Sequence, residues 1–136
     1  MRRVTGIGGI FFKCEKPQNI LEWYHKHLGI SQVGESAVFE WMQKDRPEEF
    51  GHTVWGPFEE ATRYFSPSKK GFMINYRVEN LEALIDQLRE EGVEVVGEIE
   101  KYEYGKFGWV MDPEGNKIEL WEPIDKVFRE VNGLDG

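Results

Sequence analysis

Apolar and polar residues alternate most clearly near the C-terminal end of the chain. Residues 117–122 (KIELWE) have the two-residue period of a half-buried strand, and residues 107–111 (FGWVM) form another strand candidate before them. The intervening residues 112–116 (DPEGN) are typical of a tight turn, because Pro presets φ and Gly or Asn accepts a positive φ. The pattern therefore predicts a β-hairpin.

One carboxylate on this hairpin is placed among aromatic residues. The two-residue period puts Glu119 on the same face as Lys117 and Trp121. Trp109, on the preceding strand candidate, is expected on this face or beside it. A carboxylate on a strand among aromatic side chains is the first candidate for a functional residue.

The predicted elements recur in the same order in the two halves of the chain. The first half is expected to contain a strand, a helix and three further strands, at residues 7–14, 17–28, 37–42, 53–55 and 61–65. The second half repeats this order at residues 72–78, 81–88, 93–99, 107–111 and 117–122. Residues 66–71 (SPSKKG) form the linker between them.

Short segments of the two halves also align with one another. Residues 13–15 match 77–79, residues 28–30 match 91–93, and residues 53–57 match 109–113. We therefore predict an α+β fold of two tandem β-α-β-β-β modules, residues 4–67 and 71–123, within one domain of residues 1–136. Two such modules can form a shared concave sheet, whether they pair within one chain or across a dimer. Concave, partly apolar surfaces are where small ligands bind.

A C-terminal helix is predicted over residues 124–134. Ile124, Val127, Phe128 and Val131 fall on one helical face there, and this face must cover its own module or a partner subunit. We expect a homodimer, which sedimentation at micromolar concentration would detect.

Composition and charge narrow the classes of partner. The 136 residues carry a net charge of −8, which argues against nucleic acid and anionic membranes, because both select a basic face. No apolar run approaches the ~20 residues of a membrane span. Cys14 is the only cysteine, so no intrachain disulfide is expected. Residues 1–4 do not begin a signal-peptide pattern, and the expected location is cytoplasmic.

Two stretches carry a family resemblance. With FMINYRVENLEALIDQLREEGVEVV (residues 72–96) and DPEGNKIELWEP (residues 112–123), the chain resembles the vicinal oxygen chelate superfamily over about residues 4–123. That superfamily includes glyoxalases, extradiol dioxygenases, and fosfomycin- and bleomycin-resistance proteins. The resemblance implies a glyoxalase-like fold, but it identifies a fold more reliably than a reaction.

The resemblance also implies four metal-ligand positions, on the first and last strand of each module. The alignment of the two halves puts Gly9, Arg63, Met73 and Glu119 there. Only Glu119 is a suitable ligand. Gly9 has no side chain, the Met73 thioether suits copper(I) at best, and the Arg63 guanidinium has no acceptor atom. One carboxylate cannot hold a divalent ion that needs four to six ligands. We therefore expect no metal cofactor, with a divalent metal as the alternative.

The concave surface of the shared sheet is here called the trough. Arg63 and Glu119, at equivalent positions of the two modules, are expected to face one another across it. Two interpretations remain open. In the first, the two residues form a structural ion pair that neutralises two half-buried charges. Alternatively, Arg63 binds a ligand carboxylate or phosphate while Glu119 orients the ligand or takes a proton.

Other residues complete the candidate site. Trp109 and Trp121 are expected to line the trough, where they would stack on a planar ligand. Met73 lies at one of the four equivalent positions. His52 follows a loop, so it is either a solvent-exposed loop residue or a group at the rim of the trough.

Two hypotheses of function follow. The first is a small-molecule-binding protein that has lost the usual metal site and holds an anionic or aromatic ligand in the trough. The alternative is a glyoxalase-like lyase or isomerase, which depends on a metal or uses Glu119 as acid and base. The ligand set favours the first.

Overall fold

The computed structural model describes residues 2–134, so residues 1, 135 and 136 of the predicted domain lie outside the described residues. The first module contains β1 (Val4–Cys14), α1 (Pro17–Leu28), β2 (Gln32–Val33), β3 (Ser36–Met42) and β4 (Phe50–Glu59). The second contains β5 (Phe72–Val78), α2 (Leu81–Glu90), β6 (Val95–Tyr102), β7 (Gly105–Met111) and β8 (Lys117–Pro123). Helix α3 (Asp125–Val131) follows. The predicted α+β fold of two tandem β-α-β-β-β modules is confirmed.

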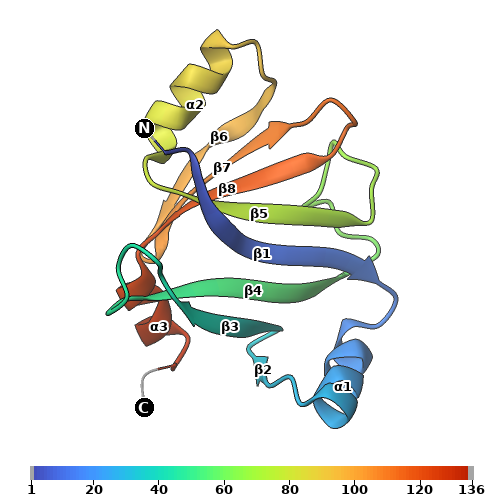
Figure 1. Ribbon diagram of the computed structural model, residues 1–136. Coiled ribbons are helices and arrows are strands. Elements are labelled where there is room, and N and C mark those ends of the chain that lie inside the picture. The colour runs from blue at the N-terminus through green and yellow to red at the C-terminus, as the bar shows by residue number, and fades with distance from the viewer. Residues whose placement is uncertain (1, 135–136) are drawn as a thin grey trace.

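The two modules share one sheet within a single chain (Figure 1). The strand order is β2-β3-β4-β1-β5-β8-β7-β6. Strands β1 and β5 pair antiparallel at the centre, and each is flanked on its other side by the last strand of its own module in parallel, β4 or β8. The sheet therefore has an approximate twofold arrangement about the β1–β5 pair.

The last strand of the first module differs from the prediction. Residues 53–55 belong to one longer strand, β4, and residues 61–65 are not a strand but part of an irregular segment over residues 60–71, here called the turn segment. Gly56-Pro57, which is typical of a turn, lies inside β4. The β3 register ends at Trp55, so at Pro57 β4 has only β1 beside it, and a residue without an N–H is tolerated there.

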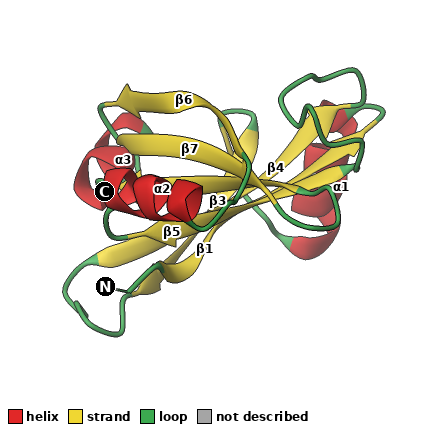
Figure 2. Ribbon diagram, turned by 90° about the horizontal axis from the view of Figure 1, so that it is seen from above, coloured by secondary structure: helices red, strands yellow, loops and turns green. Residues whose placement is uncertain are grey.

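Helix α2 covers one face of the second module. Leu81, Leu84 and Ile85 project from α2 at helical spacing and pack against Val110 and Leu120 of the sheet. Figures 1 and 2 show α1 and α2 at opposite ends of the sheet. The opposite face of the sheet, here called the trough face, carries the candidate site.

Two segments outside the sheet cover parts of the trough face. Phe65 of the turn segment is fully buried against Phe11, Met73 and Trp109. At the other end of the trough, Phe128 of α3 packs against its own chain. Among residues 2–134, none of the helices has the length and apolar character to cross a membrane.

Candidate functional site

Glu119 on β8 accepts hydrogen bonds from three neutral donors. It is only 2% exposed. Asn75 Nδ2 on β5 donates over 2.6 Å and Trp109 Nε1 on β7 over 2.9 Å, while the Tyr64 hydroxyl also donates to the carboxylate. Asn75 and Trp109 are the residues in register with Glu119 on the two neighbouring strands. The sheet thus supplies two of the three donors, and the turn segment supplies the third.

Lys117 joins this group from the same face of β8. Its Nζ donates to the main-chain oxygen of Tyr64 over 2.7 Å and lies 5.4 Å from the ring centroids of both Tyr64 and Trp109. Burial lowers the pKa of Lys117, while the nearby Glu119 acts in the opposite direction. Burial and the Glu119 carboxylate raise the pKa of Tyr64 far above its usual value, so Tyr64 remains a donor. Glu119, Tyr64, Asn75, Trp109 and Lys117 are here called the Glu119 cluster.

The predicted pairing of Arg63 with Glu119 is wrong. Arg63 lies exposed in the turn segment and makes no salt bridge within residues 2–134. The strand register explains the error: β1 and β5 pair Phe11 with Met73 and Gly9 with Asn75, and Asn75 is adjacent to Glu119.

By the twofold arrangement of the sheet, Phe11 corresponds to Asn75. The neighbour of Phe11 on β4 is Gly56, which is therefore the true counterpart of Glu119. The alignment of residues 53–57 with 109–113 is wrong for the same reason, because β4 corresponds to β8 and not to β7.

The four superfamily ligand positions are therefore Gly9, Gly56, Met73 and Glu119, and they do not fit a divalent ion. Two of them lack a side chain, and the Glu119 carboxylate already has three donors. A Cβ built on Gly9 would lie 2.6 Å from the Phe11 ring, so that ring occupies the space of a ligand there. In the described part of the chain, no group of three or more His, Cys, Asp or Glu side chains is placed to hold a metal.

A second polar cluster lies at the other end of the trough. Arg77 on β5 is 3% exposed and donates to both carboxylate oxygens of Asp125, over 2.8 and 2.6 Å. Its guanidinium lies 5.1 and 5.6 Å from the ring centroids of Trp41 and Trp121. The glycines of β1 make room for it, since a Cβ on Gly8 would lie 3.0 Å from Arg77 Cγ.

His52 belongs to this second cluster. Contrary to the expectation of a solvent-exposed loop residue, it is completely buried. Its Nδ1 lies 2.8 Å from Asp125 Oδ1 and its Nε2 lies 2.9 Å from Glu40 Oε2. Arg77, Asp125, His52 and Glu40 are here called the Arg77 cluster. The sequence patterns predicted no role for Arg77 or Asp125.

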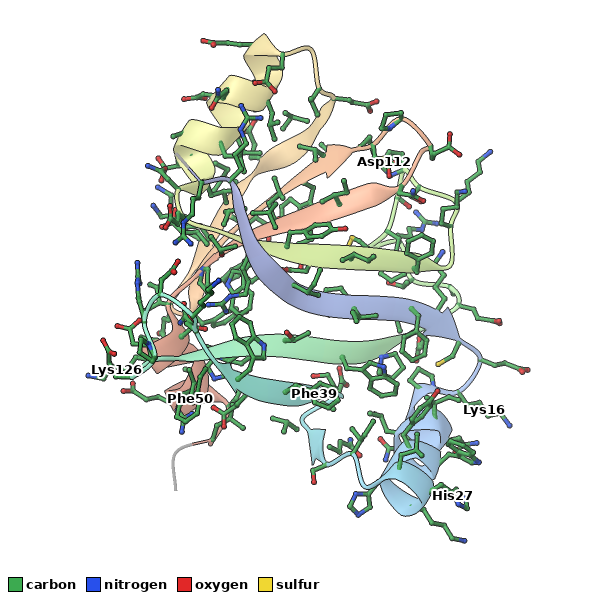
Figure 3. The ribbon with its side chains drawn as sticks, in the orientation of Figure 1. Lys16, His27, Phe39, Phe50, Asp112 and Lys126 are labelled. Carbon is green, nitrogen blue, oxygen red and sulfur yellow. The ribbon has the colours of Figure 1, made fainter. Side chains whose placement is uncertain are left out.

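An open pocket of about 890 Å³ remains over the first module. Phe11, Val54, Gly56 and Phe58 form its apolar floor on the trough face, and it is here called the module-one pocket. Lys16, directly before α1 (Figure 3), also lines the pocket. Phe58 also stacks on the Tyr64 ring, with centroids 5.6 Å apart and planes 6° from parallel. The pocket therefore adjoins the Glu119 cluster.

The comparison with known families decides the classification. Residues 9–121 match the glyoxalase-like domain family. The chain belongs to this family. The resemblance to the vicinal oxygen chelate superfamily is thereby confirmed.

Solved structures agree with the glyoxalase-like fold. A variant of the methylmalonyl-CoA epimerase of Streptomyces coelicolor, in complex with 2-nitronate-propionyl-CoA, has a TM-score of 0.64 and 17% identity over 89% of this chain and 99% of that chain. Methylmalonyl-CoA epimerase from Mycobacterium tuberculosis has a TM-score of 0.58 and 20% identity over 94% of both chains. The NAD-dependent benzaldehyde dehydrogenase from Legionella pneumophila has a TM-score of 0.53 and 15% identity over 85% of this chain and 97% of that chain. At these identities the similarity shows the fold alone, and no curated protein matches the chain.

The glyoxalase-like sheet separates the predicted site residues into groups. Glu119 and Trp109 lie in the Glu119 cluster, and Met73 is buried in the adjoining apolar group. His52 lies in the Arg77 cluster, and the Trp121 ring packs against Arg77. Tyr64 was missed, although the aromatic pair Tyr64-Phe65, directly before the polar linker of residues 66–71, was a signal that this segment is anchored.

Proposed function

We propose that this glyoxalase-like protein binds a small molecule in its trough without a metal ion. The observation that carries the proposal is the module-one pocket, which opens beside the Glu119 cluster and has an apolar, aromatic floor. Ligand sites are typically concave, mostly apolar and provided with a few polar groups that fix orientation. A volume of about 890 Å³ lies within the range of small-molecule sites.

The charges around the trough favour an aromatic ligand over an anionic one. Arg63, the expected anion anchor, is exposed in the turn segment and is not among the residues that line the pocket. Glu15, Glu35 and Glu59 line the pocket together with Lys16, so its lining has no excess of positive charge. The floor offers ring surfaces, which suit planar ligands.

A smaller pocket of about 530 Å³ lies beside the Arg77 cluster. Of the four cations that line it, Arg2, Lys44, Arg46 and Arg77, three are already paired. Arg2 contacts Asp45 and Glu79, Arg46 contacts Glu49, and Arg77 contacts Asp125. Cations that are already paired have less to offer an anionic ligand. We therefore place the ligand in the module-one pocket.

The contacts of Glu119 favour binding over acid–base chemistry. A general base must come within about 2.6–3.2 Å of the proton that it removes. The Tyr64 hydroxyl, Asn75 and Trp109 already occupy the Glu119 carboxylate. A lyase or isomerase reaction through Glu119 would require Tyr64 to move aside.

A ligand screen tests the proposal. We expect planar aromatic compounds to raise the melting temperature of the parent protein, and Val54→Trp to abolish the shift, because the larger side chain fills the pocket floor. Ile10→Trp, on the opposite face of the sheet and already 43% exposed, is the matched control and should retain the shift. No stabilising compound, or a shift that survives Val54→Trp, would refute binding in this pocket. Glu119-dependent exchange of a ligand proton with solvent deuterium would instead favour the lyase or isomerase alternative.

We also propose a cytoplasmic homodimer. Phe128 of α3 packs within its own chain, but Ile124 and Val131 remain 49% and 51% exposed and are available to a partner subunit. Sedimentation at micromolar concentration should give twice the 15.9 kDa of one chain. A monomer under these conditions would refute the dimer and leave the ligand proposal intact.

A further inference from the structure

The Tyr64 side chain is held as a bound aromatic molecule would be. One face of its ring stacks on Phe58, and the Trp109 ring stands at 87° to it with centroids 6.3 Å apart. The Lys117 ammonium lies 5.4 Å from the ring centroid. Its hydroxyl donates to Glu119. Phe58, Trp109, Lys117 and Glu119 form a slot with a stacked aromatic wall, a perpendicular aromatic ring, a cation and an acceptor at the far end.

The slot can be vacated without unfolding the turn segment. Tyr64 is 39% exposed, whereas its neighbour Phe65 is fully buried and anchors the segment in the apolar core. Lys117 binds the main-chain oxygen of Tyr64, so that contact does not depend on the position of the ring. Residues 60–71 form no strand or helix, so a rotation of the Tyr64 side chain breaks no regular backbone pairing.

We propose that Tyr64 is an internal substitute for the ligand, and that a ligand with a phenol ring displaces it from this slot. The inference rests on the proposed function, because it assigns a ligand class to the same trough. Phe58 is common to the slot and the module-one pocket, so a displaced Tyr64 ring leaves a space that adjoins the pocket.

The charges of the slot select a neutral ring with a hydroxyl donor. The buried Glu119 carboxylate would repel a carboxylate or phosphate placed at its oxygen. The Lys117 ammonium over the ring would repel a cationic ring, whereas it attracts the face of a neutral one. A hydrogen bond from a hydroxyl to a carboxylate is one of the stronger kinds in proteins. A phenol meets all of these conditions.

An internal competitor lowers the apparent affinity for the external ligand. The measured dissociation constant equals the intrinsic dissociation constant divided by the fraction of molecules in which the slot is open. Tyr64→Phe removes the hydroxyl that holds the ring on Glu119, and so it increases that fraction. Loss of one hydrogen bond to a charged group corresponds to a change of about 10- to 100-fold in this equilibrium.

Calorimetric titration with p-cresol tests the proposal. We expect Tyr64→Phe to bind p-cresol about 10- to 100-fold more tightly than the parent. It should also prefer p-cresol over toluene, and this preference should fall in Tyr64→Phe/Glu119→Gln, where the acceptor is neutral. Tyr24→Phe, which alters a tyrosine on α1 outside the slot, is the matched control and should bind as the parent does.

Magnetic resonance on the parent protein gives a test that needs no variant. With p-cresol at saturation, contacts between its ring protons and Phe58 should replace those between Tyr64 and Phe58. Unchanged Tyr64 contacts, or equal affinity for p-cresol in Tyr64→Phe and Tyr24→Phe, would overturn the inference. The proposed function would then still stand if another compound stabilised the parent and lost its effect in Val54→Trp. It would fail separately if no compound bound the trough at all.

Discussion

Glu119→Ala is expected to lower the free energy of unfolding by about 3–5 kcal/mol, because it leaves buried donors without an acceptor. Asn75 Nδ2 and Trp109 Nε1 both donate to the carboxylate, and both side chains are at least 94% buried. Each unsatisfied buried donor costs about 1–3 kcal/mol. Tyr64 is half-exposed and can turn its hydroxyl to water, so it contributes less. Urea denaturation of the parent and the variant measures the difference.

Two further variants control for charge and for volume. Glu119→Gln keeps the shape and one acceptor oxygen, so we expect a smaller loss, of about 1–2 kcal/mol. Glu114→Ala removes an exposed carboxylate from the turn before β8 and should leave stability within about 0.5 kcal/mol of the parent. If Glu119→Ala is as stable as Glu114→Ala, Glu119 does not organise the cluster.

Arg77→Met is expected to destabilise the protein by a similar amount, about 3–5 kcal/mol. The substitution removes both hydrogen bonds to Asp125 and leaves that carboxylate in a mostly buried position. Methionine refills much of the volume between Trp41 and Trp121, so the loss measures the charge pairing rather than a cavity. Arg77→Lys should recover only part of it, because an ammonium cannot bind both carboxylate oxygens as the planar guanidinium does.

The Arg77–Asp125 pair also makes stability depend on pH. Burial acts to raise the pKa of Asp125, but hydrogen bonds from Arg77 and His52 outweigh it and hold the pKa below its ordinary value of 3.8. A carboxyl whose folded pKa is lowered stabilises the protein above the unfolded pKa, and this contribution is lost as the pH falls through the folded value.

The parent should therefore lose stability below about pH 4 more steeply than Asp125→Asn, which has no carboxyl to titrate. Denaturation curves between pH 2 and 7 measure this, on the scale of ordinary carboxyl pKa values of about 4. Parallel curves for the two proteins would contradict the pairing.

The sequence was sufficient for the module order but not for the last strand of the first module. Local patterns identify elements such as α2, whose apolar stripe and Asn80 cap are contained in a few residues. Gly56-Pro57 has the local chemistry of a turn, and only the end of the β3 register beside β4 makes a strand possible there. That register is a property of the sheet and not of the segment.

The candidate site shows the same division. Glu119 and Trp109 could be placed on one face because they belong to a single hairpin. The residue of the first module that corresponds to Glu119 could not be identified. A shift of one strand in the alignment of the two halves gave Arg63 in place of Gly56. Tyr64 reaches Glu119 from 55 residues away through an irregular segment, and no periodicity predicts such a contact.

The most direct test of the central claim is whether Glu119 holds hydrogen-bond donors or a metal ion. Elemental analysis should be made on the protein purified without added metal and again after dialysis against zinc, nickel, iron and manganese. Gly9, Gly56 and Met73 at the other three positions supply no ligand set for these ions. We predict less than stoichiometric metal in every case, and the same content in parent and Glu119→Ala. One ion per chain that is lost in Glu119→Ala would contradict the account.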